Sequence, residues 1–148
     1  MTIEQFWSEF LKKTNRPETT TYYESFHFTS EEQLANELLE LVLSGKKRAT
    51  SSSLLCYAES EQPKPGNLSI VTDWGGNPHC VIETKAVQVI PFDKMTFEIC
   101  SREGEDECLE TWKEGHRHFF TLDAEEMGYA FTEDMPVVFE DFEVVYRI

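Results

Sequence analysis

The order in which helical and strand periodicities follow one another most constrains the fold of this chain. Apolar residues recur at helical spacing in two segments before residue 45, and strand-like patterns fill residues 51–92. A third helical segment starts near Leu109, and the chain closes on an alternating stretch from Val137 to Ile148. Elements grouped in this way do not form repeated βαβ units. We therefore expect an α+β fold, a small mixed sheet closed or nearly closed into a barrel with helices packed on its outside.

Capping patterns set the ends of the first two helices. Thr2 and Gln5 form a capping box ahead of a helix predicted over about residues 3–13. Ser30 and Gln33 repeat the pattern ahead of a second helix that ends near residue 44. Gly45 then stands where a left-handed C-terminal cap belongs, so the chain is expected to turn sharply there.

Strands are expected in the middle of the chain. The segments 53–57, 68–74 and 80–90 are rich in apolar and β-branched residues, and the intervening stretches carry proline and glycine. The polar, tyrosine-rich stretch 19–28 has little period of either kind and is predicted to be a connector.

Length and composition limit the domain organisation. The chain has 148 residues, of which 40% are hydrophobic and 13% aromatic, so it can build one core and is too short for two ordinary domains. We expect a single domain over residues 1–148, in which residues 1–20 form an N-terminal helical extension. This composition excludes a disordered or collagen-like chain.

The charge balance excludes some partners. Lysine and arginine number 13 against 28 acidic residues, which gives a formal net charge of -15. A protein that holds duplex DNA or a long RNA brings a basic face to the phosphates. A small or weakly charged substrate, with at most a short RNA as partner and no duplex DNA, is the better expectation.

Neither a membrane segment nor a metal framework is predicted. No stretch approaches the roughly 20 apolar residues that a membrane helix needs, and the amino terminus lacks the pattern of a signal peptide. Cysteines 56, 80, 100 and 108 contain no C-x-x-C pair, so no zinc framework is expected. The sequence predicts a cytoplasmic protein with free thiols, and no membrane partner.

The turn after the second helix is the first candidate for chemistry. Its sequence, GKKRAT from Gly45 to Thr50, runs into Ser51, Ser52 and Ser53. One interpretation is structural, because cations stabilise the negative end of a helix dipole by about 0.3–1 kcal/mol. The other is catalytic. Flanking cations and partial desolvation disfavour a charged lysine, so Lys47 can act as a general base that activates the hydroxyl of Thr50.

Two further features carry titratable groups. The run from Glu103 to Glu107 is either a solvated acidic loop at the start of a helix, or a loop in which Gly104 lets one carboxylate turn inward. His116 and His118 are two residues apart on a helix and point to different sides, so they predict no shared metal site. His116 shares an apolar face with Trp112 and Phe120, so we expect it to lie in the core or in the wall of a pocket.

Several segments together resemble the ASCH domain family, whose members have a PUA-like β-barrel. The segment from Leu41 to Thr50 resembles the G-x-K-x-x-T signature of that family. The segment from Ser101 to Phe120 is similar to its E-G-E…L-x-x-W-x-x-x-H-x-x-F-F block. Trp74 to Pro91 resembles its central hairpin, and Met135 to Ile148 its closing strand. The resemblance implies a cleft between the basic turn and the acidic loop.

The resemblance also implies a function. Some ASCH members hydrolyse the acetyl amide of N4-acetylcytidine with a threonine, a lysine and a glutamate and without a cofactor. Carried over by position, these are Thr50, Lys47 and Glu105. The acidic loop is shorter here than in longer members, so Glu103 is the alternate to Glu105. We expect the substrate contacts to come from Lys46, Arg48, Ser51, Ser52, Trp112 and His116.

Two other functions fit the same residues. In a non-catalytic RNA- or nucleotide-binding module, the cations of the turn would hold a phosphate and aromatic side chains would stack a base. A metal-independent ribonuclease would use the same lysine, threonine and glutamate. The sequence favours an amidohydrolase that acts on a modified nucleoside, since a neutral nucleoside is repelled little by an acidic protein.

Overall fold

The computed structural model describes residues 1–57 and 61–148. Helices and strands follow one another in this order: α1 (Ile3–Lys13), β1 (Glu24–Phe26), α2 (Glu32–Leu43), β2 (Ala49–Ser53), β3 (Leu68–Thr72), β4 (Pro78–Pro91), α3 (Phe97–Cys100), α4 (Leu109–Met127) and β5 (Pro136–Arg147). Short 3-10 helices add η1 (Leu54–Cys56), η3 (Phe92–Lys94) and η4 (Ser101–Glu103).

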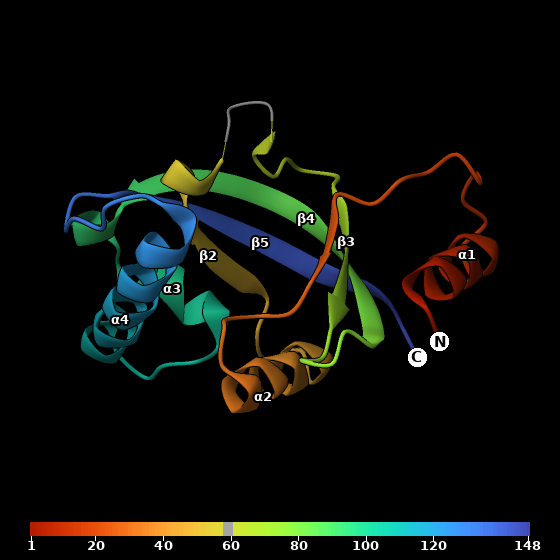
Figure 1. The fold of residues 1–148 in the computed structure, drawn as a ribbon, viewed down its shortest axis with the longest axis horizontal. Helices are drawn as coiled ribbons and strands as arrows, with labels where there is room; N and C mark the ends of the chain where they lie inside the picture. The colour runs from red at the N-terminus through yellow and green to blue at the C-terminus, as the bar shows by residue number, and fades with distance from the viewer. Residues whose placement is uncertain (58–60) are drawn as a thin grey trace.

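The strands form one mixed, five-stranded sheet in the order β1-β3-β4-β5-β2. β1 runs parallel to β3, and the other neighbours are antiparallel. The β4–β5 ladder contains register shifts at Val81/Ile82 and Thr84/Ala86, and such irregularities let long strands bend. The sheet curls into a half-barrel with helices around it (Figure 1). The α+β class and the mixed barrel-like sheet are therefore confirmed, and the barrel is half closed.

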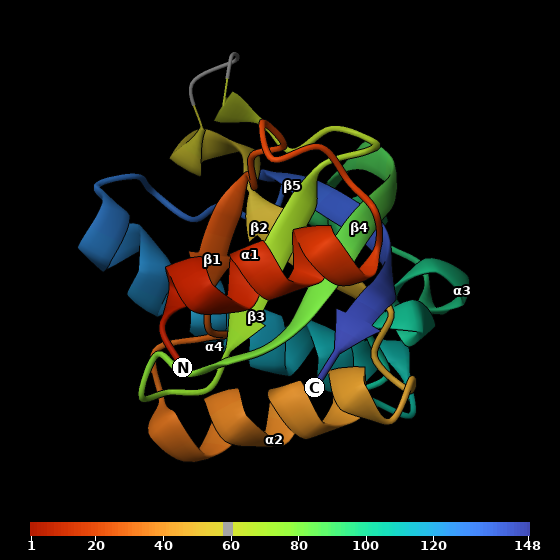
Figure 2. The ribbon, with the colours of Figure 1, turned by 90° about the vertical axis from the view of Figure 1, so that its right-hand side faces the viewer.

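Each of the longer helices covers a different part of the sheet. Figure 2 shows α1 crossing in front of β3, where Phe6 and Phe10 pack with Ile70 and Val81. The helix α2 buries one face, including Leu38, Leu39 and Val42, against Val71, Cys80, Ile82 and Phe142. At the other end of the sheet, α4 places Trp112 and Phe120 against Phe92 and Phe139.

The predicted helix ends are partly confirmed. The Thr2–Gln5 capping box is present at α1, and Gly45 follows α2 with a φ of 82°. The box predicted at Ser30 and Gln33 is wrong, because α2 begins after Glu31 and has no side-chain cap. Thr29, with a φ of 52°, turns the chain just before this helix begins.

Two strands also differ from the prediction. The strand expected over residues 53–57 is wrong: β2 ends at Ser53, whose hydroxyl accepts a hydrogen bond from the N–H of Leu55 and caps the 3-10 helix η1. β1 lies inside the expected connector, where its three residues pair with β3. A strand this short is fixed by its ladder partner, so its own sequence carries little signal.

No helix in the described parts of the chain has the length and apolar character needed to cross a membrane.

Candidate active site

The turn after α2 is fixed to the acidic loop by backbone hydrogen bonds. The N–H groups of Lys46 and Lys47 both donate to the carbonyl of Leu41, at 3.0 Å each. The N–H of Arg48 then donates to the carbonyl of Arg102 in η4, also at 3.0 Å. This last bond joins segments that lie far apart in sequence, so the lysine of the turn and the glutamates of the loop are brought to one place.

Lys47 points inward and is almost fully buried, with 2% of its surface exposed. Its Nζ donates to the carbonyl oxygen of Ala49 at 2.8 Å, to Glu103 Oε1 at 3.3 Å and to Glu105 Oε2 at 2.6 Å. These acceptors use all the N–H donors of an ammonium group. The nearest charges are therefore carboxylates, whereas the neighbouring cations Lys46 and Arg48 are exposed. The sequence predicted that flanking cations would surround Lys47. In the structure two carboxylates surround it instead.

Glu103 is the more deeply buried of the two carboxylates, with 1% of its surface exposed. Its Oε2 accepts hydrogen bonds from Ser51 Oγ at 2.8 Å and from Trp112 Nε1 at 2.7 Å, and lies 3.4 Å from His116 Nε2. Burial alone would raise the pKa of Glu103. The charges of His116 and Lys47 and these hydrogen bonds outweigh burial and lower the pKa, so Glu103 is held as a carboxylate.

Glu105 has the opposite balance. Its side chain is 18% exposed, and the pair with Lys47 Nζ is its one hydrogen bond among the described residues. Desolvation raises the pKa of Glu105 and the Glu103 carboxylate adds to this, while Lys47 acts against it. Two carboxylates in different environments commonly take different roles, one fixed as an anion and one able to exchange a proton.

Lys47, Glu103, Glu105 and His116 border a cavity of about 330 Å³. This volume is at the lower end of the range for small-molecule sites. Thr50 and Ser51 from β2 line it beside Lys47. The loop before α2, α2 itself and α4 supply an apolar wall: Phe28, Leu34, Leu38, Leu41 and Phe119. Acidic groups at the cavity are Glu37, Glu103, Glu105 and Asp106, against Lys47 and His116 as basic groups. A neutral ligand with an apolar part suits this lining.

The predicted site residues divide between the cavity and its surroundings. Lys47, Thr50, Ser51, Glu103, Glu105 and His116 line the cavity. Lys46 and Arg48 are exposed outside that lining, and the hydroxyl of Ser52 accepts from Tyr57 Oη at 2.9 Å. Trp112 is fully buried outside the cavity lining and contacts the site through Glu103, to which it donates its N–H, and through the ring of His116.

Sequence reasoning missed the apolar wall. Phe28 lies beneath the ammonium of Lys47, with its ring centroid 5.2 Å from Nζ. Leu34 and Leu38 lie on the apolar face of α2, and both line the cavity. The signal was the width of that apolar face: Leu34 stays 38% exposed because the sheet does not cover it.

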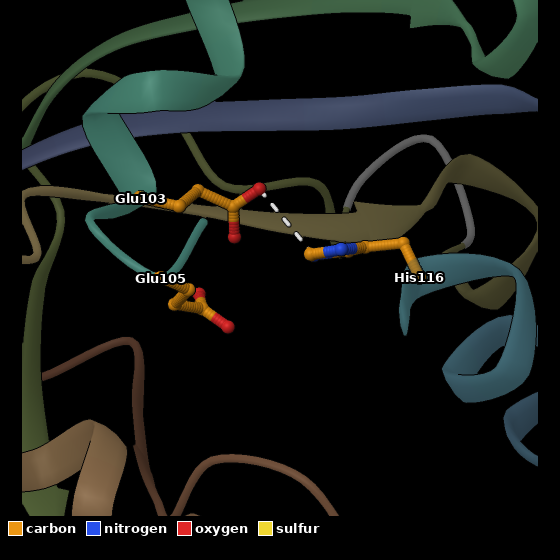
Figure 3. A group of neighbouring side chains, drawn as sticks. All are labelled: Glu103, Glu105 and His116. Carbon is orange, nitrogen blue, oxygen red and sulfur yellow. Dashed lines mark ion pairs between the residues drawn. The ribbon is translucent and has the colours of Figure 1, made fainter. Parts of the chain in front are cut away.

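Glu103, Glu105 and His116 also merit a test as metal ligands. Figure 3 shows these three side chains around a common space, and one ligand atom from each lies within 4.8 Å of the others. The ammonium of Lys47 sits 2.6 Å and 3.3 Å from the two carboxylates, so a cation bound there would have to displace it. The donors and acceptors are matched without a metal, and we assign none. The sequence predicted no metal site shared by His116 and His118, and the cluster of His116 with the two glutamates was not foreseen.

A comparison with protein families finds a match over most of the chain. A family model described as the ASCH domain matches residues 24–146. The chain belongs to the ASCH domain family. This confirms the resemblance drawn from the lysine turn and the acidic block, and the ASCH match extends from β1 into the last strand, β5.

Solved structures resemble the chain over most of its length. An ASCH domain from Lactobacillus crispatus JV V101 is 34% identical, with a TM-score of 0.82, over 98% of this chain and 92% of that one. Protein EF3133 from Enterococcus faecalis V583, described under the family DUF984, is 31% identical, with a TM-score of 0.87, over 99% and 94%. The hypothetical protein PH0355 shares the fold at 21% identity and a TM-score of 0.53, over 82% and 97%. A search of curated proteins finds no match.

Proposed function

We propose that the protein is an amidohydrolase that acts on a small acylated nucleoside such as N4-acetylcytidine. The observation that carries the proposal is the buried Lys47 ammonium, paired with Glu105 at 2.6 Å and with Glu103 at 3.3 Å, at a cavity that Thr50 also lines. A lysine, a hydroxyl and a carboxylate at one cavity form the set that acyl transfer through a hydroxyl nucleophile requires.

The proposed reaction starts with a proton transfer inside the ion pair. Every N–H of Lys47 faces an acceptor in the resting site, so the amine gains a free lone pair only when it gives up a proton. Glu105 is the acceptor, because desolvation raises its pKa and its Oε2 lies 2.6 Å from Nζ. Glu103 cannot serve as well, since its pKa is lowered and its Oε2 already accepts hydrogen bonds.

The neutral Lys47 then acts as the base. It takes the hydroxyl proton of Thr50 as Oγ1 attacks the amide carbonyl carbon, and it returns that proton to the nitrogen of the leaving cytosine amine. This step leaves the acyl group as an ester on Thr50 and releases the nucleoside. Water then attacks the ester carbonyl carbon while Lys47 accepts its proton. Lys47 returns that proton to Oγ1 as the bond between the acyl carbon and Oγ1 breaks, which releases acetic acid and restores the hydroxyl of Thr50.

The cavity lining supports a neutral substrate over a polyanion. Acidic side chains outnumber basic ones there, and the exposed Lys46 and Arg48 lie outside it. A module that grips a phosphate of RNA at the base of this cavity would place like charges together. RNA binding through the outer face of the turn remains the alternative, and it predicts an affinity that falls with salt concentration. We further propose a cytoplasmic location, consistent with the free cysteines of the described residues.

The test is turnover by purified protein. We expect N4-acetylcytidine to be converted to cytidine and acetate, with activity retained in EDTA and lost in Lys47→Ala and Thr50→Val. Chromatography of the nucleosides measures the conversion. Wild-type turnover no faster than that of Lys47→Ala would refute the proposal for this substrate. A metal-independent ribonuclease would instead cleave a short RNA under the same conditions.

A further inference from the structure

We infer that His116 is a positioning residue that carries a positive charge and, through Glu103, sets how readily the Lys47–Glu105 pair exchanges its proton. This inference rests on the proposed function for its consequence in catalysis. The charge of His116 itself can be measured without any substrate.

Both ring nitrogens of His116 lie close to oxygen atoms. His116 Nδ1 lies 3.0 Å from the carbonyl oxygen of Trp112, and its Nε2 lies 3.4 Å from Glu103 Oε2. A neutral imidazole has one donor nitrogen and one acceptor nitrogen, so one of these contacts would set two acceptors against each other. An imidazolium donates at both nitrogens and satisfies both contacts. Because Glu103 is held as a carboxylate, these contacts favour the protonated ring.

Trp112 fixes the position of the His116 ring. The imidazole stacks on the indole of Trp112, with centroids 4.1 Å apart and planes at 17°. That same indole donates its N–H to Glu103 Oε2 at 2.7 Å. Trp112 thus supports both partners of the His116–Glu103 pair, and only 12% of the His116 side chain is exposed. Figure 3 shows the ring directed from α4 toward Glu103.

Two carboxylates lie near the His116 ring. The charged groups that face His116 are Glu103 and Glu105 from the acidic loop, with Lys47 from the turn sharing both carboxylates. Burial lowers the pKa of His116, but the charge and hydrogen bond of Glu103 outweigh burial and raise it above its ordinary value. When His116 is charged, its positive charge compensates the negative charge of the Glu103 carboxylate, so Glu103 attracts Lys47 less strongly. Lys47 then exchanges its proton mainly with Glu105.

Loss of the charge on His116 changes that balance. Glu103 becomes an uncompensated buried carboxylate next to Lys47 and holds the ammonium form, so the base is formed less often. The wild-type rate is therefore expected to fall on the alkaline side as His116 loses its proton. In His116→Gln the rate is expected to drop roughly tenfold near neutral pH, which corresponds to about 1.4 kcal/mol. The pH–rate profile of this variant is expected to lack the alkaline limb.

The control is a histidine on the same helix. His118 is exposed and does not line the cavity, so His118→Gln keeps the wild-type profile. Thermal melting of both variants shows that they are folded. A change in the shape of the pH profile distinguishes a charge effect from a loss of folded protein, which lowers the rate without removing one limb.

A titration by NMR tests the charge without substrate. We expect the titration midpoint of His116 to lie above 6.5, with both ring nitrogens protonated below that midpoint, and the midpoint to fall in Glu103→Gln. A midpoint at or below 6.5, or a midpoint that Glu103→Gln leaves unchanged, overturns the inference. If the titration is as expected but the protein hydrolyses no amide, the proposed function fails and the assignment of charge stands. Equal pH–rate profiles of His116→Gln and His118→Gln overturn its role in catalysis.

Discussion

Gly104 packs against the backbone carbonyl of Lys46, so the acidic loop and the lysine turn meet at a point where no side chain fits. Gly104 has a φ of 71°, in the left-handed region, and a Cβ added there would overlap with that carbonyl. Glu103 and Glu105 flank this glycine. The close approach therefore decides how far both carboxylates reach toward Lys47.

Replacing Gly104 with alanine should be costly for this reason. A left-handed alanine costs about 1–2 kcal/mol, and the overlap with a backbone atom adds to that, so we expect Gly104→Ala to lose more than about 2 kcal/mol in unfolding free energy. Gly45→Ala is the matched control, because Gly45 also has a positive φ but open space around its Cα. Urea denaturation measures both. Equal losses of unfolding free energy in the two variants would mean that the close contact at Gly104 does not contribute to stability.

Substitutions at the two glutamates should separate their roles. Glu103 has Ser51, Trp112, His116 and Lys47 as partners inside the protein, and breaking a buried charged cluster costs about 3–5 kcal/mol. We therefore expect Glu103→Gln to be strongly destabilised. Glu105→Gln should lose about 1 kcal/mol or less, since Glu105 is partly exposed, while its turnover of N4-acetylcytidine falls by about 100-fold or more.

The measurements are urea denaturation and steady-state kinetics on both variants at the same pH. A Glu105→Gln variant with wild-type turnover, beside an inactive but stable Glu103→Gln, would reverse the assignment and make Glu103 the proton acceptor.

Glu140 on β5 predicts a pH dependence of stability. Its Oε1 accepts a hydrogen bond from Thr84 Oγ1 at 3.0 Å, and burial raises its pKa from 4.5 to about 7. Between these values the folded protein holds a proton that the unfolded chain has lost, so stability falls as pH rises from about 4.5 to 7. Glu140→Gln removes this loss and should be more stable than wild type at pH 8.

The expected gain is on the order of 1–2 kcal/mol at pH 8, allowing for the half-buried position of Glu140, and about zero at pH 4. Glu143→Gln on the same strand is the control, since its side chain is 68% exposed. Urea denaturation of both variants at the two pH values measures the difference. A gain that is the same at pH 4 and pH 8 would contradict the explanation by burial.

Leu34 should contribute to substrate binding more than to folding. It lines the cavity and is 38% exposed, so Leu34→Asn is expected to change unfolding free energy by less than about 1 kcal/mol. Loss of apolar contact with a bound substrate should raise KM several-fold with kcat little changed. Leu122→Asn, at 40% exposure on α4 and outside the cavity lining, is the control for kinetic effects of surface polarity. Equal KM values for the two variants would exclude Leu34 from the binding wall.

Local patterns predicted much of the secondary structure. The apolar spacing of residues 3–13 and the box of Thr2 with Gln5 predicted α1 correctly, because helix ends are stabilised by residues a few positions away. β1 and the true extent of β2 were missed, since their ladders pair with β3 and β5 from distant parts of the chain. For the same reason the closed or nearly closed barrel expected from the sequence is a half-barrel in the structure.

The amino-acid sequence by itself determined that Lys47 follows a helix in a tight turn and that Glu103 and Glu105 flank a glycine, because caps and turns depend on near neighbours. Only the tertiary structure decided what surrounds the amine. The Arg48–Arg102 backbone hydrogen bond and the close contact at Gly104 place two carboxylates, in contrast to the adjacent cations, around Nζ. Coulomb interactions act through space at a few ångströms, so the charged groups that contact Lys47 Nζ come from residues more than 50 positions away and not from its neighbours in the chain.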